Sequence, residues 1–109
     1  MQFTFQFIQM FGLGIYYAAP LMIFFILMIM LFGLMIGNKE GWSKSDALYY
    51  SFITATTVGY GDFRPETNFG KFMAVCIAFI GLLLTGIFVA LGVKAASIAF
   101  QALYQIPTL

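Results

Sequence analysis

The stretch TATTVGYGD, residues 54–62, differs from the rest of the sequence and decides how the fold is interpreted. It places Gly59, Tyr60, Gly61 and Asp62 directly after a Thr/Ala run, whereas most of the chain is apolar. Two glycines and a carboxylate disfavour a membrane-spanning helix. Nor is the segment expected to be a strand of a closed transmembrane barrel. Its role therefore depends on the sequence around it.

The composition of the chain is that of a membrane protein. Of 109 residues, 62% are hydrophobic and 8% are charged, whereas about a quarter of the residues in a soluble domain are charged. The net charge of +1, without a clustered basic face, argues against a nucleic-acid partner. The sequence has no histidine and one cysteine, Cys76, which argues against a zinc cluster and an intrachain disulfide.

Two uncharged blocks flank one polar segment, because eight of the nine charged side chains lie in residues 38–71 and the ninth is Lys94. Residues 13–37 are long enough to cross a hydrocarbon core of about 30 Å. They are predicted to form an outer helix, with Pro20 near its start, where a missing N–H is tolerated. A cleaved signal peptide is the alternative, but the run is too long and no basic region precedes it. A second span, the inner helix, is predicted over residues 72–104.

Residues 1–12 alternate Gln and Thr with Phe at first and then lose the alternation. An interfacial segment and a frayed terminus both remain open, since an interfacial helix normally carries cations on its polar face. No linker or repeat divides the remaining chain. We therefore expect residues 1–109 to form a single domain.

The polar segment predicts a loop that enters the membrane and returns. After a turret at residues 38–44, Ser43 and Asp46 have the spacing of a helix N-cap. The helix predicted over residues 45–56 rises only about 18 Å, little more than half the membrane. Residues 57–61, if extended, return by a similar distance, and an outer loop follows at residues 62–71. A surface loop is the alternative, but it would expose a continuous apolar face.

Non-helical backbone at membrane depth must face protein or water, because lipid offers no hydrogen bonds. Gly59 and Gly61 alternate with Val58 and Tyr60, and glycine adopts backbone conformations that are closed to other residues. Such an alternation can direct successive carbonyl oxygens to one side. A row of carbonyl oxygens binds cations.

The sequence from Thr57 to Asp62, TVGYGD, resembles the selectivity filter of potassium channels, and Thr54 to Thr56 resembles the usual approach to it. The resemblance extends through FGKFMAVCIAFIG at residues 69–81. The TVGYG loop is the established example of a carbonyl-lined filter. The resemblance implies an all-α membrane protein with two transmembrane helices, a re-entrant pore helix and an extended filter.

The resemblance also implies a four-fold symmetric homotetramer, so that each chain has three identical partner subunits in membrane lipid. No cofactor is implied, and K⁺ is the permeant ion. The expected K⁺ ligands are backbone oxygens of Thr57, Val58, Gly59 and Tyr60, with Gly61 completing the filter. The expected location is the cell membrane, with the filter loop outside and both termini in the cytoplasm.

Further roles follow from the same resemblance. Gly81 matches a position regarded as a gating hinge and Gly86 is a second candidate, although spacings such as Gly86-x-x-x-Ala90 also suit helix packing. Arg64 occupies an outer-mouth position, where its alternative is an ion pair with Glu66 in solvent. The residues expected to support the filter are Asp62, Tyr49, Tyr50 and Ile53. The residues expected to line the cavity, at helical spacing, are Leu82, Thr85, Val89, Ala90 and Val93.

Two departures qualify the resemblance. Some bacterial relatives carry glutamate where this chain has Ile53, and there it pairs with the aspartate that corresponds to Asp62. We therefore expect Asp62 to depend on hydrogen bonds from neighbours such as Tyr49. The central loop also holds four of the five Lys and Arg side chains, so the positive-inside rule would place it in the cytoplasm, against the resemblance.

Alternative functions are a non-selective cation channel of the same architecture and a non-conducting two-span assembly subunit. An enzyme is not expected, because the glycine-rich stretch lacks the Lys-Ser/Thr of a phosphate-binding loop. No Arg-rich helix is present to sense voltage. A regulatory domain or subunit outside this chain is compatible with the sequence.

Overall fold

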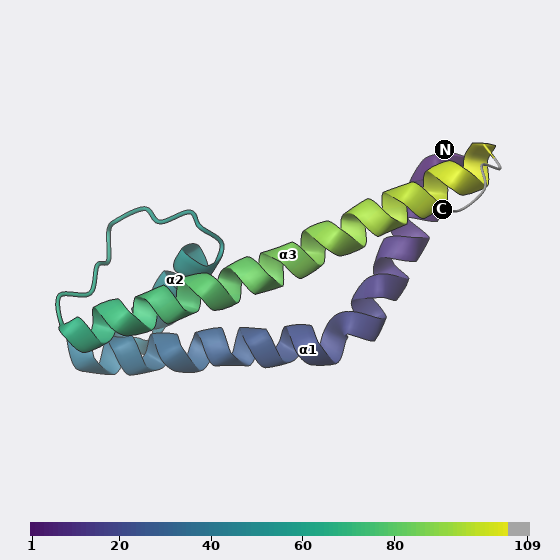
Figure 1. Ribbon diagram of the computed structural model, residues 1–109. Helices are drawn as coiled ribbons and strands as arrows, with labels where there is room; N and C mark the ends of the chain where they lie inside the picture. The colour runs from purple at the N-terminus through teal and green to yellow at the C-terminus, as the bar shows by residue number, and fades with distance from the viewer. Residues whose placement is uncertain (105–109) are drawn as a thin grey trace. The chain divides into compact units, whose positions relative to one another are not determined.

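The structure, a computed structural model, describes the backbone of residues 1–104 and the side chains of residues 1–102. Within that range the chain forms helices α1 (Gln2–Glu40), α2 (Lys44–Ala55) and α3 (Asn68–Tyr104), and no strand (Figure 1). Both α1 and α3 are long and apolar enough to cross a membrane. The predicted all-α class with two membrane-length helices is confirmed.

Helix α1 begins earlier than the predicted outer helix, at Gln2 instead of residue 13. Residues 2–12 are helical and continuous with the rest of α1, so this segment is not frayed. The rings of Phe3, Phe7 and Phe11 stack along one face, with successive centroids 6.4 and 5.6 Å apart. Aromatic contacts at this spacing stabilise a helix. Whether residues 1–12 lie along the membrane interface stays a prediction.

Pro20 lies well inside α1, so its expected place near a helix start is wrong. The helix begins at Gln2, eighteen residues earlier. An interior proline removes one backbone hydrogen bond and crowds the carbonyl of the preceding turn. This makes Pro20 the weakest point of the α1 backbone.

The end of α1 also lies beyond the predicted position, at Glu40 instead of residue 37. Gly41 has a φ of 78°, and the N–H of Trp42 donates to the Gly37 carbonyl at 2.9 Å. A left-handed glycine with this six-to-one hydrogen bond is a Schellman cap. The turret predicted at residues 38–44 is therefore reduced to residues 41–43.

The starts of α2 and α3 are both fixed by side-chain caps. The Ser43 hydroxyl accepts from the Asp46 N–H at 3.1 Å, which confirms the predicted N-cap and starts α2 at Lys44. The Thr67 hydroxyl accepts from the Gly70 N–H at 3.0 Å, so α3 begins at Asn68, four residues before the predicted position. The outer loop consequently ends at residue 67, not 71.

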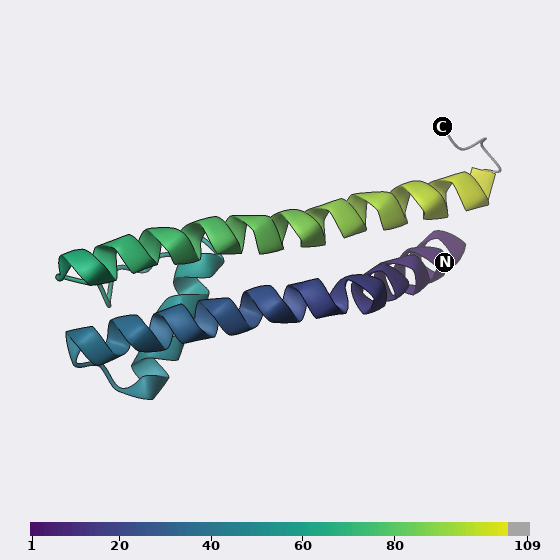
Figure 2. The same cartoon turned by 60° about the horizontal axis from the view of Figure 1, so that its bottom comes forward.

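The chain divides into two compact units. Residues 22–85 form the first, which we call the filter unit. The described residues 1–21 and 86–104 form the second, which we call the end unit. In the filter unit, α2 lies beside the second half of α1 and the first half of α3 (Figure 2).

Close packing in the filter unit depends on small residues. A Cβ at Gly33 would overlap the Ser51 hydroxyl, and one at Gly37 would lie 2.5 Å from the Ala47 Cβ. Glycines four residues apart therefore let α2 approach α1, as in close helix pairs in membranes. Ser51 is fully buried, and its hydroxyl donates to the Ala47 carbonyl at 2.7 Å. The buried core around this contact consists of Ile29, Ile36, Tyr50, Ala55, Met73 and Ile77.

In the end unit, the first part of α1 packs against the last part of α3. Leu91 reaches across to Gly14, where a built Cβ would lie 3.0 Å from the leucine Cδ2. Near the chain start, the Phe11 ring comes within 4.0 Å of the position that a Cβ would occupy at Gly92. Glycine on each helix thus accommodates a large side chain from the other.

Candidate ion-selectivity site

Helix α2 ends in carbonyl groups that hold the start of the glycine-containing segment. The Ile53 carbonyl accepts two hydrogen bonds, from the N–H groups of Val58 at 2.9 Å and Gly59 at 3.1 Å. The Thr57 N–H donates to the Thr54 carbonyl at 3.2 Å. The chain therefore leaves α2 through a tight turn, and the backbone of Ile53 anchors the segment. At 12 residues, α2 is about 18 Å long, shorter than a membrane.

The segment from Thr57 to Gly61 has an alternating backbone. Thr57, Gly59 and Gly61 have φ angles of 66°, 56° and 84°, whereas Val58 and Tyr60 between them do not have positive φ. The two glycines were expected to use conformations closed to other residues, and they do. Thr57 adds a third such position that the sequence did not reveal. A threonine with positive φ is unusual and costs about 1–3 kcal/mol, which is the kind of strain found at functional sites.

The side chains of this segment make little contact with their own chain. Val58 is 50% exposed and Tyr60 is 71% exposed. All five residues predicted to line a cavity, from Leu82 to Val93, are also exposed. Within residues 1–102 of one chain, these two surfaces are largely uncovered.

Aromatic rings from three places meet behind the segment. The Trp42 ring lies 5.1 Å from the Tyr50 ring and 5.4 Å from the Phe63 ring. Tyr49 lies edge-on to Phe63 at 6.1 Å. Of these residues, Tyr49 and Tyr50 were predicted as filter support. Trp42 and Phe63 were not predicted, although the sequence shows one aromatic residue before the short helix and one after the glycine-containing segment.

The Asp62 carboxylate is held by two groups. The Phe63 N–H donates to its Oδ1 at 3.1 Å, and the Tyr49 side chain is hydrogen-bonded to it. Desolvation and this hydrogen bond to Asp62 raise the pKa of Tyr49, with smaller contributions from the charges of Asp62 and Tyr60. Tyr49 therefore stays a neutral donor. Whether Asp62 depends on Tyr49 stays a prediction.

The Glu40 carboxylate, which was not predicted as a site residue, fixes the loop that follows the segment. Glu40 accepts from the Glu66 N–H at 3.0 Å, from the Thr67 N–H at 3.1 Å and from the Thr67 hydroxyl at 2.6 Å. One carboxylate thus joins the end of α1 to the N-cap of α3. Beside it, the Lys39 amine lies 5.8 Å from the centre of the Phe69 ring.

The predicted hinge residues have different surroundings. Gly81 is buried, and a Cβ there would overlap the Ala55 carbonyl at the end of α2. Gly86 is exposed, with no other side chain within 4 Å of such a Cβ. Close packing therefore accounts for glycine at position 81, and the packing that the sequence suggested for Gly86 is not found within the described chain. Arg64 is exposed, and within residues 1–102 it forms no ion pair with Glu66.

These features define a class of protein: two membrane-length helices, with a short helix and a strained, glycine-containing segment between them. A family profile described as "Ion channel" matches residues 21–97, which is more than half of the chain. The chain belongs to this ion-channel family. The predicted recognition as a potassium-channel pore domain is confirmed, and so is its classification as a channel rather than an enzyme.

Curated relatives match about half of the chain. Potassium channel protein 1 of Methanocaldococcus jannaschii is 37% identical over 57 residues, which cover 52% of this chain and 17% of that protein. Two pore potassium channel b of Oryza sativa subsp. japonica is 37% identical over 65 residues, covering 55% and 19%. The voltage-gated potassium channel of Aeropyrum pernix is 46% identical over 45 residues, covering 41% and 15%.

This chain thus spans less than a fifth of the length of these relatives. No solved structure matches the chain.

Proposed function

We propose that this chain is one subunit of a K⁺-selective channel, through which K⁺ passes passively across a membrane. The observation that carries the proposal is the alternation of positive φ at Thr57, Gly59 and Gly61, directly after a helix too short to cross a membrane. In this proposal the carbonyls of residues 57–60 and the Thr57 hydroxyl replace the water around a dehydrated K⁺ ion. The names of the relatives, all potassium channels, support this choice of ion.

The proposal includes a homotetramer, which the resemblance to potassium channels implies and which the chemistry of the ion supports. One segment offers ligands on one side only, whereas a dehydrated K⁺ ion needs oxygen atoms all around it. The exposed Val58 and Tyr60 side chains and the exposed face of α3 from Leu82 to Val93 are apolar surfaces that neighbouring subunits would cover. In the tetramer, Leu82, Thr85, Val89, Ala90 and Val93 line the cavity.

Helix α2 contributes an electrostatic term in this arrangement. Its C-terminal end carries about half a negative charge, and four such ends around one cavity favour a cation there. Asp62, with Tyr49 and the aromatic rings around Phe63, holds the outer end of the filter in place. Gly81 and Gly86 remain the proposed hinge residues of α3, and Arg64 lies at the outer mouth.

The orientation in the membrane is part of the proposal. The filter loop faces the outside and both termini face the cytoplasm, with lipid around α1 and α3. Protease cleavage of the turret at residues 41–43 in sealed cells tests this orientation. Because the relatives extend well beyond the matched region, we assign the opening stimulus to a regulatory domain or subunit outside this chain.

Reversal potentials of protein reconstituted in lipid bilayers, in opposed K⁺ and Na⁺ gradients, test selectivity directly. We expect the reversal potential to follow K⁺ alone, and Ba²⁺ to block the current. Gly59→Ala should reduce selectivity, because an alanine at a φ of 56° is strained. Gly41→Ala is the matched control, since Gly41 also has positive φ but lies outside the filter.

Two results would overturn the proposal. A reversal potential that follows Na⁺ as well as K⁺ would favour the non-selective channel. An intact two-span protein that carries no cation current would favour the assembly subunit.

A further inference from the structure

The end unit contains a groove that combines apolar walls with one cation. Its volume is about 190 Å³, below the roughly 300–1,000 Å³ of pockets that enclose drug-sized ligands. At Gly14, the Leu91 side chain occupies the space that a side chain on α1 would take. The lining residues are Met10, Leu13, Gly14 and Tyr17 from α1 and Leu91, Lys94, Ala95 and Ile98 from α3.

Along each helix, the stretch between the charged segment and the groove residues is about as long as a hydrocarbon core is thick. From Lys71, in the charged segment, to Lys94 there are 23 residues along α3, or about 34 Å of helix. From Asn38 to Tyr17 along α1 there are 21 residues, or about 31 Å. Both lengths match a hydrocarbon core of about 30 Å. Tyr17 is also 74% exposed, as is typical of tyrosines in the interfacial aromatic belt.

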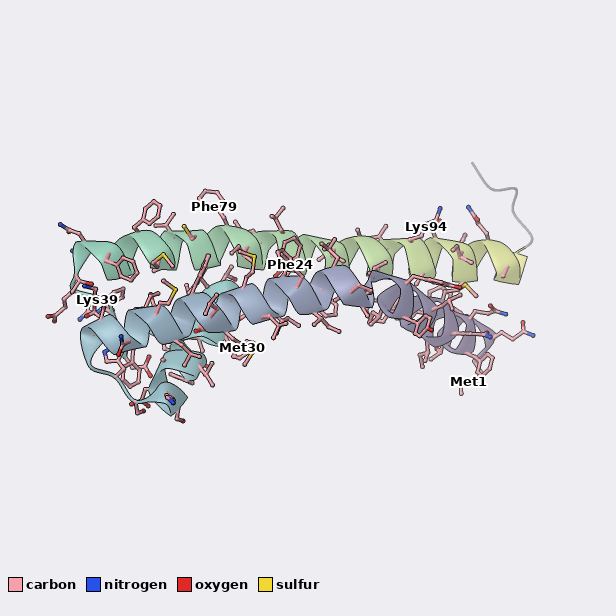
Figure 3. The ribbon with its side chains drawn as sticks, turned by 90° about the horizontal axis from the view of Figure 1, so that it is seen from below. Met1, Phe24, Met30, Lys39, Phe79 and Lys94 are labelled. Carbon is pink, nitrogen blue, oxygen red and sulfur yellow. The ribbon has the colours of Figure 1, made fainter. Side chains whose placement is uncertain are left out.

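Lys94 is the only charged side chain at this end of the molecule, because residues 1–37 and 72–109 contain no other. It is exposed, and its amine points away from α1 (Figure 3). The stem of the side chain lines the groove while the amine stays free. A long cationic side chain at this depth places its charge among the lipid phosphates.

We propose that this groove binds an anionic phospholipid from the leaflet opposite the filter loop. The phosphate pairs with the Lys94 amine, and the upper part of an acyl chain lies along the groove against Tyr17 and Leu91. Charge complementarity selects the anionic lipid, since residues 1–37 and 72–102 contain no Asp or Glu that would compete for Lys94 and a zwitterionic headgroup brings its own cation. The proposal needs the chain to lie in a membrane but does not depend on ion conduction.

Tryptophan quenching by brominated lipid tests the site in the full chain. Trp42 is the only tryptophan, so Trp42→Phe combined with Tyr17→Trp leaves one reporter, in the groove. The protein is reconstituted with phosphatidylglycerol or phosphatidylcholine brominated in the acyl chain. We expect phosphatidylglycerol to bind at the reporter about fivefold more tightly, the preference that one lysine near a membrane surface provides.

Three variants of the reporter protein separate a specific site from general attraction. Lys94→Gln should abolish the preference for phosphatidylglycerol, Lys94→Arg should keep it, and Lys71→Gln, at the far end of α3, should leave it unchanged. Equal quenching by both lipids, or a preference that survives Lys94→Gln, would overturn the proposal. The absence of quenching by either lipid would also overturn it, since protein would then cover the groove. None of these measurements requires an ion current, so their outcome is independent of whether the proposed channel function is correct.

Discussion

Glu40 and Thr67 are 27 residues apart in sequence, yet the Glu40 Oε2 atom accepts from both the N–H and the hydroxyl of Thr67. Because Thr67 also caps α3, the carboxylate holds the end of α1, the outer loop and the start of α3 together. A Cβ at Gly70 would lie 2.8 Å from the same oxygen, so the carboxylate lies close against the first turn of α3. Glu40 is thus the main polar connection between the two long helices in the filter unit.

Glu40→Gln should weaken this connection, since an amide offers one acceptor oxygen where the carboxylate offers two, without its charge. We expect a lower midpoint of thermal unfolding, by a few degrees, and faster loss of K⁺ current during sustained opening. Glu66→Gln is the matched control, because only the backbone of Glu66 takes part. If the two variants have the same unfolding midpoint and the same rate of current loss, the Glu40 contact contributes nothing to stability or to sustained conduction.

The same contact predicts a dependence on acid. Glu40 lies beyond the apolar stretch 13–37, and the hydroxyl of Thr67 and then the N–H of Glu66 lower its pKa below the usual 4.5. A lowered pKa in the folded state means that the contribution to stability is present above pH 4.5 and is lost as the pH falls through the folded value. The midpoint of thermal unfolding should therefore fall further under acid for the wild type than for the Glu40→Gln variant. Parallel pH profiles of the two proteins would contradict this.

Local patterns in the sequence predicted the parts of the fold that depend on neighbouring residues. The Ser43 cap follows from the spacing to Asp46, and the two long helices follow from uninterrupted apolar runs. The glycines of the segment were expected to use unusual conformations because Gly59 and Gly61 alternate with larger residues. Each of these features is determined within a few positions along the chain.

Features that depend on distant residues were not predicted. The Glu40 contact joins positions 27 residues apart, and no pattern around either residue indicates the other. Helix α3 starts at Asn68 because Thr67 caps it, and Thr67 is held in place by its hydrogen bonds to Glu40. Gly81 matched a hinge position in sequence, but only the approach of Ala55 shows that a side chain has no room there.

Gly81 and Gly86 should therefore respond differently to alanine. Gly81→Ala places a Cβ against the Ala55 carbonyl, so we expect α2 to be displaced, with reduced thermal stability and weakened K⁺ selectivity. Gly86→Ala has room within the chain, and it removes the roughly 1 kcal/mol helix penalty of glycine. It should leave stability unchanged or higher while altering the open probability, if α3 bends at this residue. Single-channel recordings combined with thermal unfolding separate the two effects, and a stable, selective Gly81→Ala protein would refute the packing role.

Tyr49→Phe should change the stability of the conducting filter, because it removes the hydrogen bond to Asp62. We expect inactivation during sustained opening to become several times faster. Tyr50→Phe serves as the control, since Tyr50 contacts Trp42 through its ring and phenylalanine keeps that contact.

Ile53→Glu should also change inactivation, by introducing a carboxylate behind the filter near Asp62. If the wild type and Ile53→Glu inactivate with the same kinetics, Asp62 is not supported differently in this chain than in the relatives that carry glutamate at this position.

Arg64 should control block by external tetraethylammonium. Four exposed arginines around the outer mouth of a tetramer would repel a quaternary ammonium ion, so we expect poor block of the wild type. Arg64→Tyr removes this repulsion and offers aromatic faces, which attract such cations by about 0.5–1 kcal/mol at exposed sites. Block should therefore strengthen several-fold or more, whereas Arg64→Gln, which removes the charge without adding a ring, should show an intermediate effect. Dose–response curves in symmetric K⁺ give these affinities, and submillimolar block of the wild type would exclude a ring of arginines at the mouth.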